Sequence, residues 1–255
     1  MPAQFLIPFA ALMGAVIGSF LNVVIVRLPQ NESLILPRSR CRACATELPW
    51  FDNIPVLSFV ALRGRCRACD AAISWRYPIV EATTALLFVL AAWQSSSPGR
   101  LLTDWLFVSV LVVVAGIDID HQVIPDRITL PGIGVGVLLS FLGIRASWLE
   151  SLLGIAVGGG LLFAVILLSG GGMGGGDMKL GAMIGAFLGY KLALLALFVA
   201  VILGGLVAVA LLSTGIRRRK DPIPFGPFLA AGAALAMLWG EAVLRWYLNV
   251  FSPAV

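Results

Sequence analysis

The feature of this sequence that most constrains its fold is a succession of long apolar runs. A membrane span needs roughly 20 apolar residues, and runs close to this length recur along the whole chain. They cover residues 4–26, 78–95, 101–117, 128–144, 149–169, 179–213 and 226–248. Only 12% of the 255 residues are charged, whereas a soluble globular protein has about 25%. The sequence therefore predicts an all-α polytopic membrane protein.

The run 179–213 is too long for one span, and it contains Gly181, Gly185 and Gly189 followed by Lys191. Glycine is unfavourable inside a helix and marks a possible break. We expect a short helix over 179–190 and a full span over 192–213. The fold class is therefore about eight membrane helices, with a small cytoplasmic zinc-ribbon-like insert after the first.

The polar segment between the first two spans, which we call the cysteine insert (residues 28–77), indicates the topology. It carries four acidic residues against seven arginines, which are Arg38, Arg40, Arg42, Arg63, Arg65, Arg67 and Arg76. The excess of arginine predicts a cytoplasmic location for the insert and an outside location for the amino terminus. With eight segments the basic cluster 217–220 is cytoplasmic as well; with seven it would be outside.

These assignments divide the chain into three parts. Residues 1–27 form a first membrane helix, which we expect to be retained because no basic region precedes it. The cysteine insert follows, and residues 78–255 form a helical membrane domain. The net charge of +5 does not indicate a nucleic-acid partner, because the basic residues lie between apolar runs and report topology; the expected surroundings are membrane lipids.

Four cysteines lie in the insert as two C-x-x-C pairs, Cys41/Cys44 and Cys66/Cys69. Two C-x-x-C pairs within one short polar segment are typical of tetrahedral zinc sites. A structural four-cysteine zinc site is the preferred interpretation, and unmetallated thiols are the alternative. A cytoplasmic location argues against a lasting disulfide. Such a zinc would stabilise a segment of about 50 residues that buries little core.

Three aspartates border the apolar runs on the side assigned to the cytoplasm. Asp118 and Asp120 follow the run 101–117, and Asp177 precedes the run 179–213. Two carboxylates that lie close together share one proton and can act as base and acid on a bound water. A solvated loop edge is the competing interpretation for Asp118, Asp120 and Asp126. His121 is interpreted as a loop residue.

Glycines precede Asp177. Gly174, Gly175 and Gly176 have no Cβ, so a substrate strand or a neighbouring helix could approach the backbone closely. Asp177 would then stand at a helix start, where an anion is favoured. A flexible loop before a helix is the alternative interpretation of the glycines, and interfacial anchoring is the alternative for Asp177 with Lys179.

The chain resembles the type IV prepilin leader peptidases, which are also amino-terminal methyltransferases. The similarity runs over nearly the whole length, through GSFLNVVIVRLP, the two CRAC segments, DNIPVLS, ISWRYPIVE, IDIDHQVIPD, GGGDMKLGA and IPFGPFLA. The G-x-G-D signature at Gly174–Asp177, together with a second aspartate and the paired C-x-x-C insert, is specific.

The resemblance implies an aspartic endopeptidase of the bacterial inner membrane that acts at its cytoplasmic face. Asp118 takes the place of the first catalytic aspartate, with Asp120 as runner-up, and Asp177 that of the second. The implied substrates are prepilins or pseudopilins, cleaved after a glycine. The new amino terminus is then methylated from S-adenosylmethionine, for which Asp52, Asn53 and Glu81 are the nearby polar residues, with structural hydrogen bonding as the alternative role.

Two rival functions use the same residues. A proton-coupled membrane carrier would use Asp118 and Asp177 as a relay, but it predicts polar residues through the bilayer midplane, where these runs are apolar. A zinc-anchored assembly protein without activity would tolerate asparagine at both positions.

Overall fold

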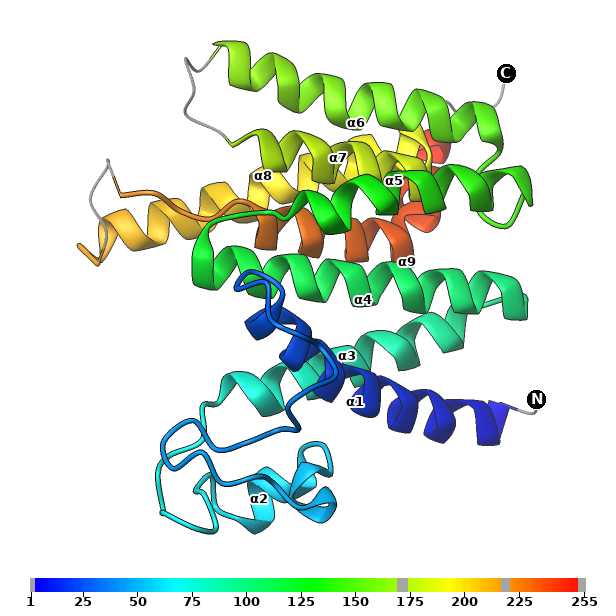
Figure 1. Cartoon of the computed structure of the whole chain (residues 1–255). Coiled ribbons are helices and arrows are strands. Elements are labelled where there is room, and N and C mark those ends of the chain that lie inside the picture. The colour runs from blue at the N-terminus through cyan, green and yellow to red at the C-terminus, as the bar shows by residue number, and fades with distance from the viewer. Residues whose placement is uncertain (1–2, 169–173, 217–220, 252–255) are drawn as a thin grey trace. The chain divides into compact units, whose positions relative to one another are not determined.

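The chain is helical throughout the part that its computed structural model describes, which is residues 3–168, 174–216 and 221–251. In these ranges two isolated antiparallel bridges are the only β-type pairing. The helices are α1 (Ala3–Arg27), the 3₁₀ helix η1 (Trp50–Asn53), α2 (Leu57–Ala61), α3 (Arg76–Gln94), α4 (Pro98–His121), α5 (Asp126–Phe141), α6 (Trp148–Leu168), α7 (Gly175–Leu188), α8 (Tyr190–Ser213) and α9 (Gly226–Phe251) (Figure 1). The prediction of an all-α protein is confirmed.

Six of the described helices are long and apolar enough to cross a membrane, namely α1, α3, α4, α6, α8 and α9. The chain is thus a multi-pass membrane protein. The two others among the eight predicted segments are shorter, because α5 has 16 residues and α7 has 14. At ~1.5 Å per residue α7 extends about 21 Å, which is less than the ~30 Å hydrocarbon core.

The predicted break inside the run 179–213 is confirmed. Helix α7 ends at Leu188 and α8 begins at Tyr190. Gly189, between them, has a φ of 77°, a conformation that glycine adopts without the steric penalty of a side chain. Its N–H donates to the carbonyl of Gly185 (2.9 Å), which closes the last turn of α7.

The sequence ends the apolar run that begins at 101 at residue 117 and places Asp118 and Asp120 after it, but α4 continues to His121. Gln122 then has a φ of 54° and donates its N–H to the carbonyl of Asp118 (2.9 Å). A residue in the left-handed region commonly ends a helix in this way. Asp118 is therefore held by a helix and not by a loop.

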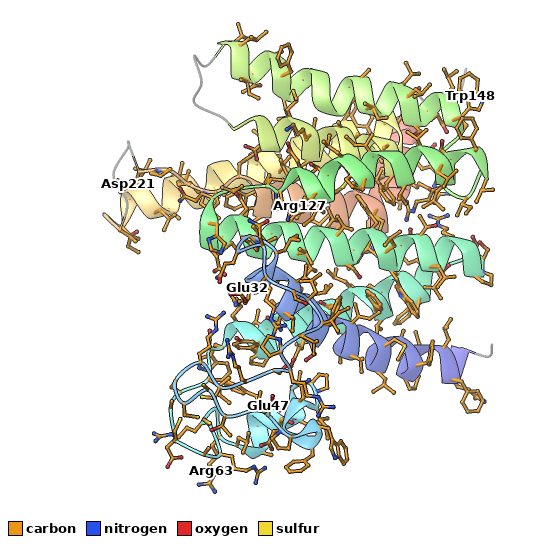
Figure 2. All side chains as sticks on the ribbon, viewed as in Figure 1. Glu32, Glu47, Arg63, Arg127, Trp148 and Asp221 are labelled. Atoms are coloured by element: carbon orange, nitrogen blue, oxygen red, sulfur yellow. The ribbon has the colours of Figure 1, made fainter. Side chains whose placement is uncertain are left out.

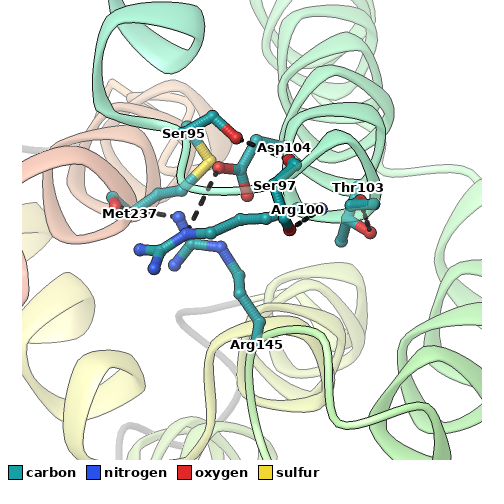
Figure 3. A network of polar contacts seen from close by, with 8 residues as sticks. Ser95, Ser97, Arg100, Thr103, Asp104, Arg145 and Met237 are labelled. Atoms are coloured by element: carbon teal, nitrogen blue, oxygen red, sulfur yellow. Dashed lines mark hydrogen bonds and ion pairs between the residues drawn. The ribbon is translucent and has the colours of Figure 1, made fainter.

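The chain forms two compact units, Met1–Val113 and Val114–Val255. In the first, α1 packs along α3. The indole of Trp105 stacks on Phe88, with ring centroids 4.7 Å apart, and donates to the Phe88 carbonyl (3.1 Å). Arg100 and Asp104 form an ion pair one turn apart on α4 (4.0 Å), drawn in Figure 3.

In the second unit α7 packs between α6 and α5, and α8 packs along α9 (Figure 1). The residues Leu180–Leu188 of α7 are all buried. Ser151 on α6 donates to the carbonyl of Ala186 on α7 (2.8 Å). Arg145, before α6, donates to the carbonyl of Met237 on α9 (3.0 Å), as Figure 3 shows. Helix α7 is therefore the buried centre of this unit.

Two sequence features lie outside the described residues. They are the basic cluster 217–220 used in the topology argument and the glycines at 170–172.

Candidate functional site

Asp118 lies in the last turn of α4, and only 5% of its surface is exposed. Its Oδ2 accepts a hydrogen bond from the backbone N–H of Gly226, the first residue of α9 (2.8 Å). A Cβ at position 226 would lie 2.7 Å from this oxygen, so the close approach requires glycine. The start of a helix also favours a negative charge.

Asp177 lies in the first turn of α7, three residues after the N-cap Gly174. A hydrogen bond from the backbone of Gly174 to its carboxylate satisfies a donor that the helix start leaves open, as in a capping box. Burial, and secondly the negative charge of Asp118, raise the pKa of Asp177 to about 6. Asp177 precedes the predicted segment 179–190 and lies on none of the six spans.

The structure thus brings Asp118 and Asp177 together, near enough for one charge to act on the other. They are 59 positions apart in the sequence and come from α4 and α7 of one compact unit. Two carboxyl groups in this relation resist double ionisation and favour a state with one shared proton. Such a pair can accept a proton from water and donate another to a carbonyl oxygen.

Asp120, the other acidic candidate on α4, differs from Asp118 in its exposure. Asp120, two residues after Asp118 on α4, is exposed, and so is His121. Residues two apart on a helix do not share a face. Asp118 is therefore the member of this group that faces into the unit.

The three glycines before Asp177 have different surroundings. Gly176 lies against Ile124, because a Cβ there would be 2.8 Å from the Ile124 side chain. Gly174 and Gly175 are exposed, and a Cβ at Gly175 would meet nothing within 4 Å. One glycine thus serves packing and the other two leave open space beside Asp177.

An ion pair near the aspartates was not predicted from the sequence. Lys179 donates from Nζ to both carboxylate oxygens of Asp126, at 2.7 Å each. The pair joins the second turn of α7 to the first residue of α5. The sequence gives no signal for this pairing across 53 positions, since both residues resemble ordinary charges at helix starts.

The four cysteines form a cluster in which all ligand sulfurs lie within 4.8 Å of one another. The Sγ atoms of Cys41 and Cys69 are 3.8 Å apart. Tetrahedral zinc with Zn–S bonds of about 2.3 Å places its sulfurs about 3.8 Å apart, so the donor set fits. All four cysteines are free of disulfides.

The two cysteine pairs are built alike. The pentapeptide RCRAC occurs twice, at 40–44 and 65–69. In each copy the first cysteine donates its N–H to a carbonyl five residues on, at 2.9 Å, Cys41 to Thr46 and Cys66 to Ala71. An isolated bridge flanks each copy. Glu47 and Arg63, two charged residues of the insert, are labelled in Figure 2.

The three polar residues nominated near the insert differ in their bonding. The carboxylate of Asp52 accepts two hydrogen bonds from Arg67 (2.9 and 2.6 Å), which hold its pKa below the usual value. Glu81, buried on α3, accepts from the backbone N–H of Val56 (2.7 Å). The side chain of Asn53 is exposed and has no hydrogen-bond partner among the described residues.

Comparison with known proteins covers both units. Residues 12–95 match the family model described as Bacterial Peptidase A24 N-terminal domain, and residues 105–209 match the Type IV leader peptidase family. The Bacillus subtilis (strain 168) prepilin leader peptidase/N-methyltransferase is 38% identical, over 94% of this chain and 96% of the relative.

Two further relatives with the same printed name cover similar lengths. The Aeromonas hydrophila protein is 39% identical over 94% of this chain and 93% of its own length. The Pseudomonas aeruginosa protein is 36% identical over 93% of this chain and 92% of its own length. No solved structure matches this chain.

Proposed function

Because the chain belongs to the prepilin leader peptidase/N-methyltransferase family, and is thus a peptidase with N-methyltransferase activity, we propose that Asp118 and Asp177 are its peptidase catalytic pair. The single observation that carries this assignment is the electrostatic coupling of the two carboxyl groups inside one compact unit. The substrates are prepilins or pseudopilins, whose leader is cut after a glycine.

The reaction needs no covalent intermediate. One aspartate, ionised, takes a proton from a water molecule as the water oxygen attacks the scissile carbonyl carbon. The other, protonated, donates its proton to the carbonyl oxygen. When the C–N bond breaks, one aspartate gives its proton to the leaving amine, the other takes a proton from a hydroxyl of the tetrahedral intermediate, and the peptide is released with a new carboxyl group. The pair ends with one shared proton, as it began.

The surroundings of the pair support this role. Gly226 donates to one oxygen of Asp118 and so fixes that carboxylate. Gly174 and Gly175 leave room beside Asp177 for an extended substrate backbone. The prepilin leader and the cleavage site would lie at the cytoplasmic face of the bacterial inner membrane, with the amino terminus of the enzyme outside. Residues 1–27 and 78–255 would form the membrane part.

The cysteine insert would have a separate, structural role. Cys41, Cys44, Cys66 and Cys69 would hold one zinc ion, which closes the two RCRAC turns into a single small body. Four thiolate ligands leave no open position for a substrate, so this zinc would not take part in hydrolysis. The methyl donor would be S-adenosylmethionine.

Cleavage of a prepilin by purified protein in detergent tests the assignment. Asp118→Asn and Asp177→Asn should each lower the rate by at least about 10³-fold, because an amide cannot exchange the proton. Asp120→Asn, which changes an exposed carboxylate on the same helix end, should keep the wild-type rate. A carrier or an inactive assembly protein would leave the prepilin intact even in the wild type. Full activity of either asparagine variant would refute the catalytic pair.

A further inference from the structure

A cavity of ≈ 600 Å³ lies in the first unit, between the end of α1 and the cysteine insert. Ser19, Phe20 and Arg27 line it from α1, and Arg38, Trp50 and Asn53 line it from the insert. Sites for small ligands commonly have volumes of ~300–1,000 Å³ and combine apolar walls with a few polar groups. This cavity has both properties and is not part of the aspartate site.

We propose that this cavity binds S-adenosylmethionine for the methyl transfer. The inference rests on the proposed use of that donor, and it adds the place and the residues. The ligand has four parts to be recognised: an adenine ring, a ribose, a carboxylate, and a positively charged sulfonium with a neighbouring ammonium group. The cavity offers a matching group for each charged part and for the ring.

The adenine ring is matched by Trp50 and Asn53. Trp50 is 81% exposed, and its ring lies at 80° to the ring of Phe51, with the centroids 5.8 Å apart. An exposed indole can stack a base. The carboxamide of Asn53 has no partner among the described residues, and an amide of this kind pairs with the edge of adenine through one donor and one acceptor.

The carboxylate is matched by Arg38. The other arginine of the cavity, Arg27, already donates to the carbonyls of Ser33 (2.9 Å) and Pro37 (2.8 Å). Arg38 makes no hydrogen bond or ion pair with the residues that the structure describes. One open guanidinium suits a ligand with a single carboxylate, which it binds through two parallel hydrogen bonds.

The positive end of the ligand is matched by Ser19, Phe20 and Glu81. The hydroxyl of Ser19 hydrogen-bonds the carboxylate of Glu81, so an acidic group lies directly behind the cavity wall. Phe20 is half exposed on the same wall, and an aromatic face attracts a cation. In the transfer, the amine nitrogen bonds to the methyl carbon as the C–S bond breaks. Sulfur keeps the electron pair, and the amine proton passes to water.

Direct binding tests the assignment without relying on turnover. We would titrate the purified full-length protein with S-adenosylhomocysteine by calorimetry and follow prepilin cleavage in parallel. Trp50→Ala and Arg38→Ala should each weaken binding by about tenfold or more. Trp93→Ala is the matched control, because Trp93 is 79% exposed but lies at the far end of α3 and outside the cavity; its affinity should equal that of the wild type.

Photolabelling of the wild type gives a second readout that does not depend on the folding of variants. An azido-adenine analogue of S-adenosylmethionine should label peptides within residues 28–57. Labelling elsewhere, or unchanged affinity in both cavity variants, would overturn the assignment. A wild type that cleaves prepilin but does not bind S-adenosylhomocysteine would refute this inference and leave the peptidase proposal standing. A wild type that binds but does not cleave would refute the peptidase proposal alone.

Discussion

In the cysteine insert, charged side chains connect one segment to the next, whereas around Asp177 the helices meet through bare backbone. Arg67 donates two hydrogen bonds to Asp52, and its guanidinium lies 5.4 Å from the centroid of the Phe51 ring. In the other region, Gly158 on α6 lies directly against Gly181 on α7, four residues after Asp177, with no side chain between them.

The difference follows from the surroundings of each region. A segment of about 50 residues exposed to water cannot bury a sufficient core, so polar pairing and a metal must hold it. Among apolar helices there is no hydrophobic drive for association, and small residues permit the close van der Waals contact that replaces it. The insert should therefore be sensitive to loss of charge or metal, and the aspartate region to an increase in side-chain size.

The largest effect is expected from a larger side chain at the α6–α7 contact. A Cβ at position 158 would overlap the carbonyl oxygen of Gly181, so Gly158→Leu must push α7 away and move Asp177. A displacement of about 1 Å can lower a rate by about 10²-fold, and we expect at least this loss in prepilin cleavage.

Gly160→Leu is the matched control, because a Cβ at this neighbouring position would meet nothing within 4 Å. Cleavage by that variant should match the wild type. Equal losses in the two variants would show that α6 tolerates no leucine in general, and the contact with Gly181 would not be the cause.

Removal of the metal tests whether the cysteine insert depends on zinc. Elemental analysis should find one zinc per chain, and Cys66→Ser should lose it, because a cluster with three thiolates binds zinc more weakly. We expect methylation of a cleaved pilin to be lost, since the cavity wall belongs to the insert. Cleavage should fall by less than about tenfold, because Asp118 and Asp177 lie in the other unit. Parallel loss of the two activities would contradict this separation.

The ion pair between Lys179 and Asp126 predicts a smaller change, visible in the pH profile. In Asp126→Asn the charge of Lys179, two positions after Asp177 in the sequence, is no longer neutralised, and it should lower the raised pKa of the Asp177 carboxyl. The active state needs the shared proton, which is lost as pH rises through this pKa. The alkaline limb should therefore move to lower pH, by about 0.2–0.7 units, because an exposed ion pair contributes only about 0.2–1 kcal/mol.

The double variant Asp126→Asn/Lys179→Met is the control for that shift. It removes both charges and should restore the wild-type limb. A shift that persists in the double variant would indicate a change of structure and not of charge.

Apolar length and composition were enough to predict the helices, and the glycines predicted a break between 190 and 192, which lies at Gly189 in the structure. The end of α4 was misplaced because a carboxylate after an apolar run resembles a loop. Asp118 belongs to the last turn of α4, and its side chain accepts from Gly226, 108 positions later. The pairing of Asp126 with Lys179 has the same origin. Contacts between distant positions leave no local pattern, so the sequence predicted the two aspartates but not the groups that hold them.

The smallest effect is expected when the same arginine is replaced in the two copies of RCRAC, which have the same sequence but different neighbours. Arg67 in the second copy binds Asp52, whose side chain is only 3% exposed. Arg42, its counterpart in the first copy, is exposed and has no partner among the described residues. Arg67→Ala leaves the Asp52 carboxylate buried without its donors, which is unfavourable, whereas Arg42→Ala removes only a solvated charge. Thermal unfolding should shift downward by a few degrees in the first variant and stay unchanged in the second. Equal midpoints would mean that solvent replaces Arg67 fully, as it does for many surface ion pairs, and that the insert depends on its metal alone.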